Sequence, residues 1–167
     1  MEVVIRPIER GTYTPIAVDV ISCTYNMNGF TAMNSVLIAH GLNREYFRQC
    51  GRMHEGTKFQ VICHGDCYER PQIITVSKTE RWDSEPGATT EILTIADCER
   101  CVSLCLTHFG FILGDFPASA FRQCLESIRC AGGLEKLKRV VVDIDARCYQ
   151  HALDVHSQVR RSVIVDM

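Results

Sequence analysis

The sequence predicts a single α/β domain, a three-layer α/β/α sandwich with a mixed, largely parallel sheet. Two observations support this fold class. Apolar runs typical of strands buried on both faces alternate along the chain with amphipathic segments of helical length. The 167 residues, of which 46% are hydrophobic and 23% charged, have the composition of an ordinary globular domain and contain no repeat or linker. We therefore expect one domain over residues 1–167.

The first half of the chain is predicted to contain four strands and one interrupted helix. Pro7 lies near the end of the first strand, which suits the edge of a sheet because proline cannot donate to a strand ladder. The helix covers residues 32–50 and is broken at Gly41. The four strands cover residues 3–8, 17–24, 59–63 and 72–78.

The second half is predicted to contain three helices and one strand. Thr90 is the expected N-cap of a helix over about 91–107, where apolar residues recur at helical spacing. Pro117 begins the next helix and Gly132–Gly133 end it. The strand RVVVDID covers residues 139–145, and the last helix covers residues 148–161.

Charge and targeting features predict an intracellular protein, cytoplasmic or nuclear. The net charge of −2 gives no overall attraction to nucleic acid or to an anionic membrane. No apolar run reaches the length of a membrane span, and Glu2 and Arg6 interrupt the N-terminal apolar patch, unlike in a signal peptide. We expect no membrane partner, no nucleic-acid partner and no cofactor.

Ten cysteines are many for a chain of this length, and without a secretory signal they are expected to be mostly free thiols. Cys23, Cys105 and Cys124 occupy apolar positions inside predicted elements, where a reduced cysteine packs as a small hydrophobe. The histidines outside position 64, His108 among them, lack the spacing of a metal site and are expected at the surface.

Two cysteine pairs leave a zinc site as an alternative. Cys63 with Cys67, and Cys98 with Cys101, have the CxxxC and CxxC spacing of tetrahedral zinc ligands. The second pair lies inside a predicted helix, which does not form the knuckle-like turn that such a site needs. Cys63 and His64 are neighbours, but adjacent strand residues point to opposite faces and do not form a catalytic dyad. Free thiols remain the preferred interpretation.

Four segments of the chain follow the motif order of one known family. DVISCTYN (19–26) stands where that family has DAIVNAAN, and GFTAMNSVL (29–37) stands where it has a glycine-rich run with Val-Asp. GDFPASAFRQCLESI (114–128) is similar to the family's GxFGxP turn and helix, and residues 134–153 are similar to its final strand and helix. In this order, nearly the whole chain resembles the macro domain, an ADP-ribose-binding α/β fold.

Set against the family's motifs, this chain lacks most of the ligand-binding side chains. The family's acid that holds adenine would fall near Gly11 or Thr12, neither of which is acidic, and only Asn26 remains of the loop asparagines. Phe30 occupies the glycine run, where a side chain crowds the approach of the backbone to a diphosphate. Asn34 replaces the aspartate that positions water in family hydrolases, and an amide does not take a proton as a carboxylate does. The loop over 110–116 lacks the family's Ser-Thr-Gly.

The resemblance implies a non-catalytic binding or interaction module that keeps weak ADP-ribose or nucleotide binding. A crevice filled by Phe30, Met33 and Phe111 would instead imply a protein partner or self-association into a homo-oligomer. An active ADP-ribosyl hydrolase or O-acetyl-ADP-ribose deacetylase is the alternative, with Asn26 and Asn34 orienting water. The residues expected to line the ligand path are Thr12, Asn26, Gly29, Phe30, Asn34, Gly110, Phe111, Gly114 and Phe116.

Overall fold

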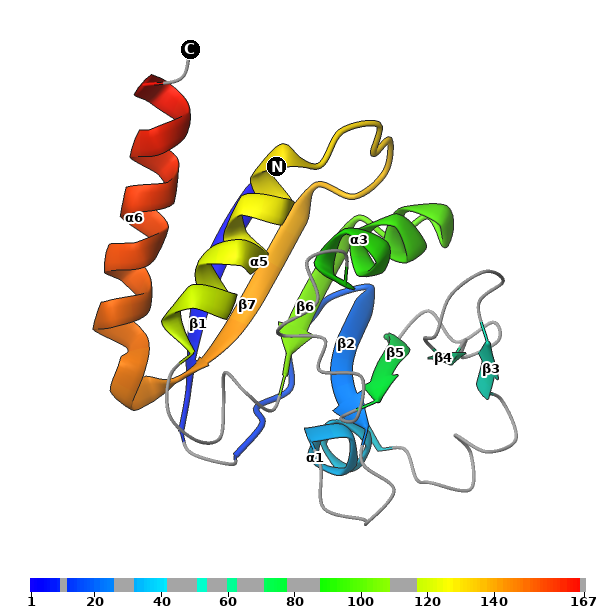
Figure 1. The fold of residues 1–167 in the computed structure, drawn as a ribbon. Helices are drawn as coiled ribbons and strands as arrows, with labels where there is room; N and C mark the ends of the chain where they lie inside the picture. Colours follow the sequence, from blue (N-terminus) through cyan, green and yellow to red (C-terminus); the bar gives the residue numbers. More distant parts are fainter. Residues whose placement is uncertain are drawn as a thin grey trace.

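A seven-stranded mixed sheet runs through the centre of the computed structural model, with the strand order β1-β7-β6-β2-β5-β4-β3 (Figure 1). The structure describes residues 1–9, 12–25, 32–41, 51–53, 60–62, 71–77, 88–108 and 117–165. The strands are β1 (Glu2–Ile8), β2 (Val20–Tyr25), β3 (Gly51–Met53), β4 (Gln60–Ile62), β5 (Gln72–Ser77), β6 (Ser103–Thr107) and β7 (Arg139–Asp145).

The sheet is largely parallel, which confirms the predicted fold class. β1, β7, β6, β2 and β5 pair in parallel, whereas β4 and β3 are antiparallel additions at one edge. β1, which carries Pro7, forms the opposite edge, as its proline predicted. β3 was not predicted, because the three residues GRM offer no recognisable strand pattern.

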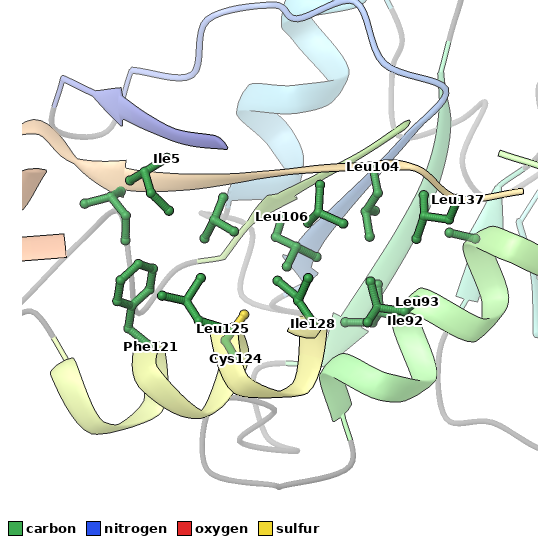
Figure 2. Packing of buried hydrophobic residues seen from close by; sticks show 14 of the residues in the cluster. Ile5, Ile92, Leu93, Leu104, Leu106, Phe121, Cys124, Leu125, Ile128 and Leu137 are labelled. Atoms are coloured by element: carbon green, nitrogen blue, oxygen red, sulfur yellow. The ribbon is translucent and has the colours of Figure 1, made fainter. Parts of the chain in front are cut away.

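Helices cover both faces of the sheet. The described helices are α1 (Ala32–Ala39), α3 (Ala88–Cys98), α5 (Ala118–Cys130), the short 3₁₀ turn η3 (Ala146–Cys148) and α6 (Tyr149–Val165). On one face, Phe121, Leu125 and Ile128 of α5 pack against alternate strand residues such as Leu104 and Leu106, as Figure 2 shows. This core also takes in side chains of α3 and α6. The other face holds a second core.

The second core joins α1 to the remaining alternate strand residues. Val36 and Leu37 of α1 pack with Ile21, Cys23 and Val141, and the segment after β1 contributes buried side chains. Two cores on opposite faces of one sheet give the three layers that the sequence predicted. No helix among the described residues has the length and apolar character needed to cross a membrane.

The predicted helix over 91–107 was wrong in both its start and its end. The helix α3 begins at Ala88, so Thr90 lies within its first turn and is not the N-cap. Arg100 then adopts a left-handed conformation with φ of 61°, and the Cys101 and Arg100 amides donate to the carbonyls of Ala96 and Asp97. This Schellman turn ends the helix.

The remainder of the predicted helix is the buried central strand β6, SLCLT. Its apolar residues Leu104, Cys105 and Leu106 are all fully buried, because helices and strands cover both faces of this part of the sheet. A short run that is apolar on every side has no period that separates a strand from a helix. The sequence pattern was therefore ambiguous at this point.

The later boundaries and the cysteines agree with the predictions. Pro117 is the N-cap residue of α5, and Gly132 and Gly133 follow its end, Gly133 with a φ of 75°. Every cysteine that the structure describes is a free thiol. Cys23, Cys105 and Cys124 are buried as predicted, and burial raises the pKa of the Cys124 thiol to about 12.

Two aspartate side chains accept hydrogen bonds from backbone amides near the amino ends of the parallel strands. Asp19, just before β2, accepts hydrogen bonds from the Val102 and Ser103 amides at 2.8 and 3.3 Å, which ties β2 to β6. Asp97, near the end of α3, accepts from the amides of residues 135–137 at 2.6 to 3.2 Å. These backbone hydrogen bonds lower the pKa of the Asp97 carboxyl.

We expect Asp97→Asn to destabilise the fold at neutral pH, because it removes the charge that three backbone amides solvate. The native pKa lies below the ordinary value of 3.8, so this contribution is complete above pH 3.8 and is lost as the pH falls through the native pKa. Urea unfolding across the acid range should show the two proteins converge. The control Asp154→Asn, on the surface of α6, removes an equal charge; an identical effect there would contradict the assignment.

Candidate functional site

The carboxyl ends of β2 and β6 meet at the point where the direction of chain progression across the sheet reverses. The two strands pair in parallel from Val20 with Leu104 to Cys23 with Thr107. The chain leaves β2 toward β5 on one side, whereas it leaves β6 toward β7 on the other. In open α/β sheets, this topological switch point is where the ligand crevice lies. The candidate site is therefore the crevice outside β2 and β6.

Two helices begin at this edge of the sheet, one after each of the two strands. α1 starts at Ala32, following β2, and α5 starts at Ala118, following β6 (Figure 1). Neither helix has an acidic residue in its first turn, and Pro117 makes no side-chain cap to α5. The first amides of each helix lack intrahelical acceptors and carry partial positive charge. Both helix ends are thus suited to an anion.

A buried histidine, His108, directly follows the carboxyl end of β6. His108 is fully buried, and its Nε2 lies 3.2 Å from the Oγ of Ser22, which is also fully buried on β2. Burial lowers the pKa of the His108 ring from 6.5 to about 3, so the ring is neutral. The prediction of a surface histidine was wrong here, because His108 continues the core-facing series of Leu104 and Leu106.

A polar network that the sequence analysis missed lies on the other face of the sheet. Arg6 of β1 and Asp143 of β7 are register partners, joined by Nε–Oδ1 and Nη2–Oδ2 contacts of 2.7 and 2.8 Å. The thiol of Cys105 donates to the same carboxylate at 3.4 Å. Burial opposes the charge of Arg6, but Asp143 outweighs it and raises the pKa of the guanidinium. The sequence signal for this ion pair was a basic residue, Arg6, inside one apolar strand and an acidic residue, Asp143, inside another.

The network continues from Arg6 to the end of α1. Arg6 donates to the Thr14 carbonyl at 2.8 Å and stacks over the Tyr13 ring at 5.4 Å. The Tyr13 hydroxyl and His40 Nε2 share a hydrogen bond of 2.9 Å. Burial, and the charge of Arg6, lower the pKa of His40. The network therefore anchors both the segment after β1 and the helix α1, whose N-terminus faces the candidate crevice.

The buried carboxylates near this edge already have partners. Among the described residues, the buried acidic side chains are those of Asp143 and Asp145. Asp143 is held by Arg6, as above. Asp145 ends β7, accepts the Arg147 amide at 3.0 Å and forms an ion pair with the Arg147 guanidinium at 2.9 Å. Both carboxylates therefore hold the fold together at the ends of the strands.

Of the residues predicted to line the ligand path, the structure describes two. Thr12 is exposed after β1, and its amide donates to the Glu9 carbonyl at 2.8 Å. Asn34 lies in the first turn of α1, at the candidate crevice. The remaining predicted residues lie outside the described residues, in segments 26–31 and 109–116, which follow β2 and β6 in the chain: Asn26, Gly29, Phe30, Gly110, Phe111, Gly114 and Phe116.

Of the two cysteine pairs that could hold zinc, the structure describes one, Cys98 and Cys101. Cys98 is exposed at the end of α3, whereas Cys101 is buried beyond the Schellman turn, with its thiol 3.8 Å from the Glu99 carbonyl. Cys63 and Cys67 lie outside the described residues. No cluster of three or more metal-ligating side chains occurs within the described parts of the chain.

We expect His108 to make stability depend on pH. The unfolded ring takes up a proton near pH 6.5, whereas the native ring does so near pH 3. The free energy of unfolding should therefore fall as the pH decreases between these values, by up to about 1.4 kcal/mol per pH unit. Chemical unfolding of His108→Gln, which can still bond Ser22, should show a shallower slope. His151→Gln removes an exposed imidazole from α6, and an equally shallow slope for it would refute the assignment.

Comparisons with known proteins bear on the fold. No protein-family model matches the chain, and no curated protein matches it in sequence. In structure, the chain is similar to the macro domain of ganglioside induced differentiation associated protein 2. The TM-score is 0.61 at 16% sequence identity, and the match covers 93% of this chain and 84% of that one. The chain therefore has a divergent macro-domain-like fold, as its motif order predicted.

Proposed function

We propose that this domain is a non-catalytic module that binds ADP-ribose or a related nucleotide in the crevice outside β2 and β6. The observation that carries the proposal is the position of this crevice at the switch point of a macro-domain-like sheet. The two segments with the motif resemblance, 26–31 and 109–116, follow these two strands in the chain. Asn26, the retained asparagine, comes directly after β2.

The diphosphate is the part of the ligand that the geometry suits best. The N-termini of α1 and α5 offer two sets of backbone N–H groups at the same edge of the sheet. Neither first turn contains an acidic side chain that would compete with a phosphate. Backbone donors of this kind bind anions without any conserved side chain. This arrangement supports phosphate binding despite the altered motifs.

Binding is expected to be weak. The family's acid that holds adenine falls near Gly11 or Thr12 in this chain, and neither residue carries a negative charge. Phe30 places a large side chain in the run where glycines let the backbone approach the diphosphate. Both differences remove affinity while leaving the helix N-termini in place.

We propose that the domain is not catalytic because one acidic group of the family is replaced here and the described buried carboxylates are already paired. In place of the family's aspartate the chain carries Asn34, in the first turn of α1. An amide orients water but does not accept its proton. The buried carboxylates at this edge within the described residues, Asp143 and Asp145, are engaged by arginines. Neither of these two described carboxylates is therefore proposed as a general base.

Calorimetric titration of the full chain with ADP-ribose tests the proposal. We expect saturable heat, and no release of ADP-ribose from an ADP-ribosylated protein under the same conditions. Turnover would overturn the non-catalytic assignment and favour the hydrolase. A titration without heat at millimolar ligand would overturn nucleotide binding, and would leave a filled crevice that serves a protein partner or self-association.

Substitutions in the segment after β2, measured by the same calorimetric titration, test where the ligand binds. Asn26→Ala should weaken binding about tenfold, since the motif resemblance assigns this amide a hydrogen bond to the ligand. Asn28→Ala is the matched control and should leave the affinity unchanged. Phe30→Gly should strengthen binding, because it restores the open backbone of the family's glycine run. Equal effects of the two asparagine variants would show that the motif placement is wrong.

A further inference from the structure

A cavity of about 490 Å³ lies at the amino end of β1, away from the candidate crevice. Its walls come from the start of β1, the last turn of α5 and the middle of α6 (Figure 1). Met1, Val3 and Ile128 supply apolar surface. Because the crevice follows the carboxyl ends of the strands, the length of a strand, about 20 Å, separates the two places.

Three basic side chains converge on this cavity. Arg129 comes from the last turn of α5, and His156 and Arg160 lie one turn apart on α6. Burial lowers the pKa of His156, and the charges of Arg160 and Arg129 lower it further. His156 is therefore mostly neutral at pH 7, and the positive charge beside this cavity comes from Arg129 and Arg160.

The cations of the cluster lack an acidic partner among the described residues. Neither Arg129 nor Arg160 forms a hydrogen bond or ion pair with any described side chain. Among the described lining residues the one acid is Glu2, whose carboxylate is exposed and lies 3.9 Å from the Nε of Arg139. An anion in the cavity would be the group that offsets the converging charges.

We propose that this cavity binds the phosphate or diphosphate group of a small metabolite. Its volume falls within the range of small-molecule sites. Its lining exposes more polar than apolar surface, which suits a charged group better than an apolar one. Guanidinium groups bind phosphate oxygens through paired hydrogen bonds, and two helices present two of them here. A nucleic-acid groove would need a longer basic track with aromatic rings for base stacking. The site is separate from the proposed nucleotide crevice and does not depend on it.

Titration of the full chain with inorganic phosphate and with pyrophosphate, followed by NMR of ¹⁵N-labelled histidines, tests this proposal. We expect a saturable shift of the His156 signals and a higher pKa of His156 in the bound state, because the anion offsets the charges of Arg129 and Arg160. Saturation with either anion supports the site, and tighter binding of pyrophosphate assigns a diphosphate.

Variants that each remove one positive charge distinguish a specific anion site from a general attraction of anions to the protein surface. Arg129→Gln and Arg160→Gln should each weaken binding about tenfold or more. Arg161→Gln removes the same charge from the next, exposed position of α6, which does not line the cavity, and should change the affinity less than twofold. All three positions are exposed, so circular dichroism should show each variant folded.

Three results would overturn the proposal. The first is a His156 shift that stays linear at millimolar pyrophosphate, which indicates no bound complex. The second is an equal loss of affinity in Arg161→Gln, which indicates a diffuse charge effect. The third is tighter binding of a short single-stranded oligonucleotide to the same residues, which would identify a nucleic-acid surface instead.

Discussion

The buried ion pair between Arg6 and Asp143 fixes the strand register on which the rest of the parallel sheet depends. The Asp143 side chain is fully buried, so it requires a partner, and only the register that places it opposite Arg6 supplies one. A slip by one residue would turn the carboxylate into the apolar core on the other face. Cys105 and the Thr14 carbonyl bind the same pair, which extends the constraint to β6 and to the segment after β1. Removing one partner of such a pair costs about 3–5 kcal/mol.

The two ends of the sheet have different roles as a consequence. At the amino ends, Asp19 and Asp97 hold strands and connecting segments together through backbone amides. At the carboxyl ends, β2 and β6 lead into segments that carry the family-like motifs, and the helices α1 and α5 begin at this edge. A rigid amino edge lets the carboxyl edge vary in sequence while the crevice keeps its position. This division explains how the fold persists although most of the ligand-binding side chains differ from the family pattern.

Much of the fold could be predicted from the sequence, but the polar interior could not. Runs such as RVVVDID identified the buried parallel strands, and Pro7 identified the edge. The sequence predicts a helix where β6 lies, because SLCLT has no period that identifies a strand. The turn that separates β6 from α3 depends on Arg100, a residue without the usual turn signal. The partners of Arg6, Ser22 and His108 lie far away in the chain, so single-sequence patterns do not reveal them. For the candidate site, the motif order identified the two segments, while the adjacency of the strands that precede them followed only from the pairing of β2 with β6.

We propose that the ligand binds at the carboxyl ends of β2 and β6. Backbone NMR of the ¹⁵N-labelled chain during addition of ADP-ribose tests this most directly, because the amino end of each strand serves as an internal control. We predict shifts for the amides of Cys23 and Thr107, at the carboxyl ends, and little change for Val20 and Leu104, the register pair toward the amino ends. Shifts confined to Val20 and Leu104, or no shifts at millimolar ligand, would contradict it.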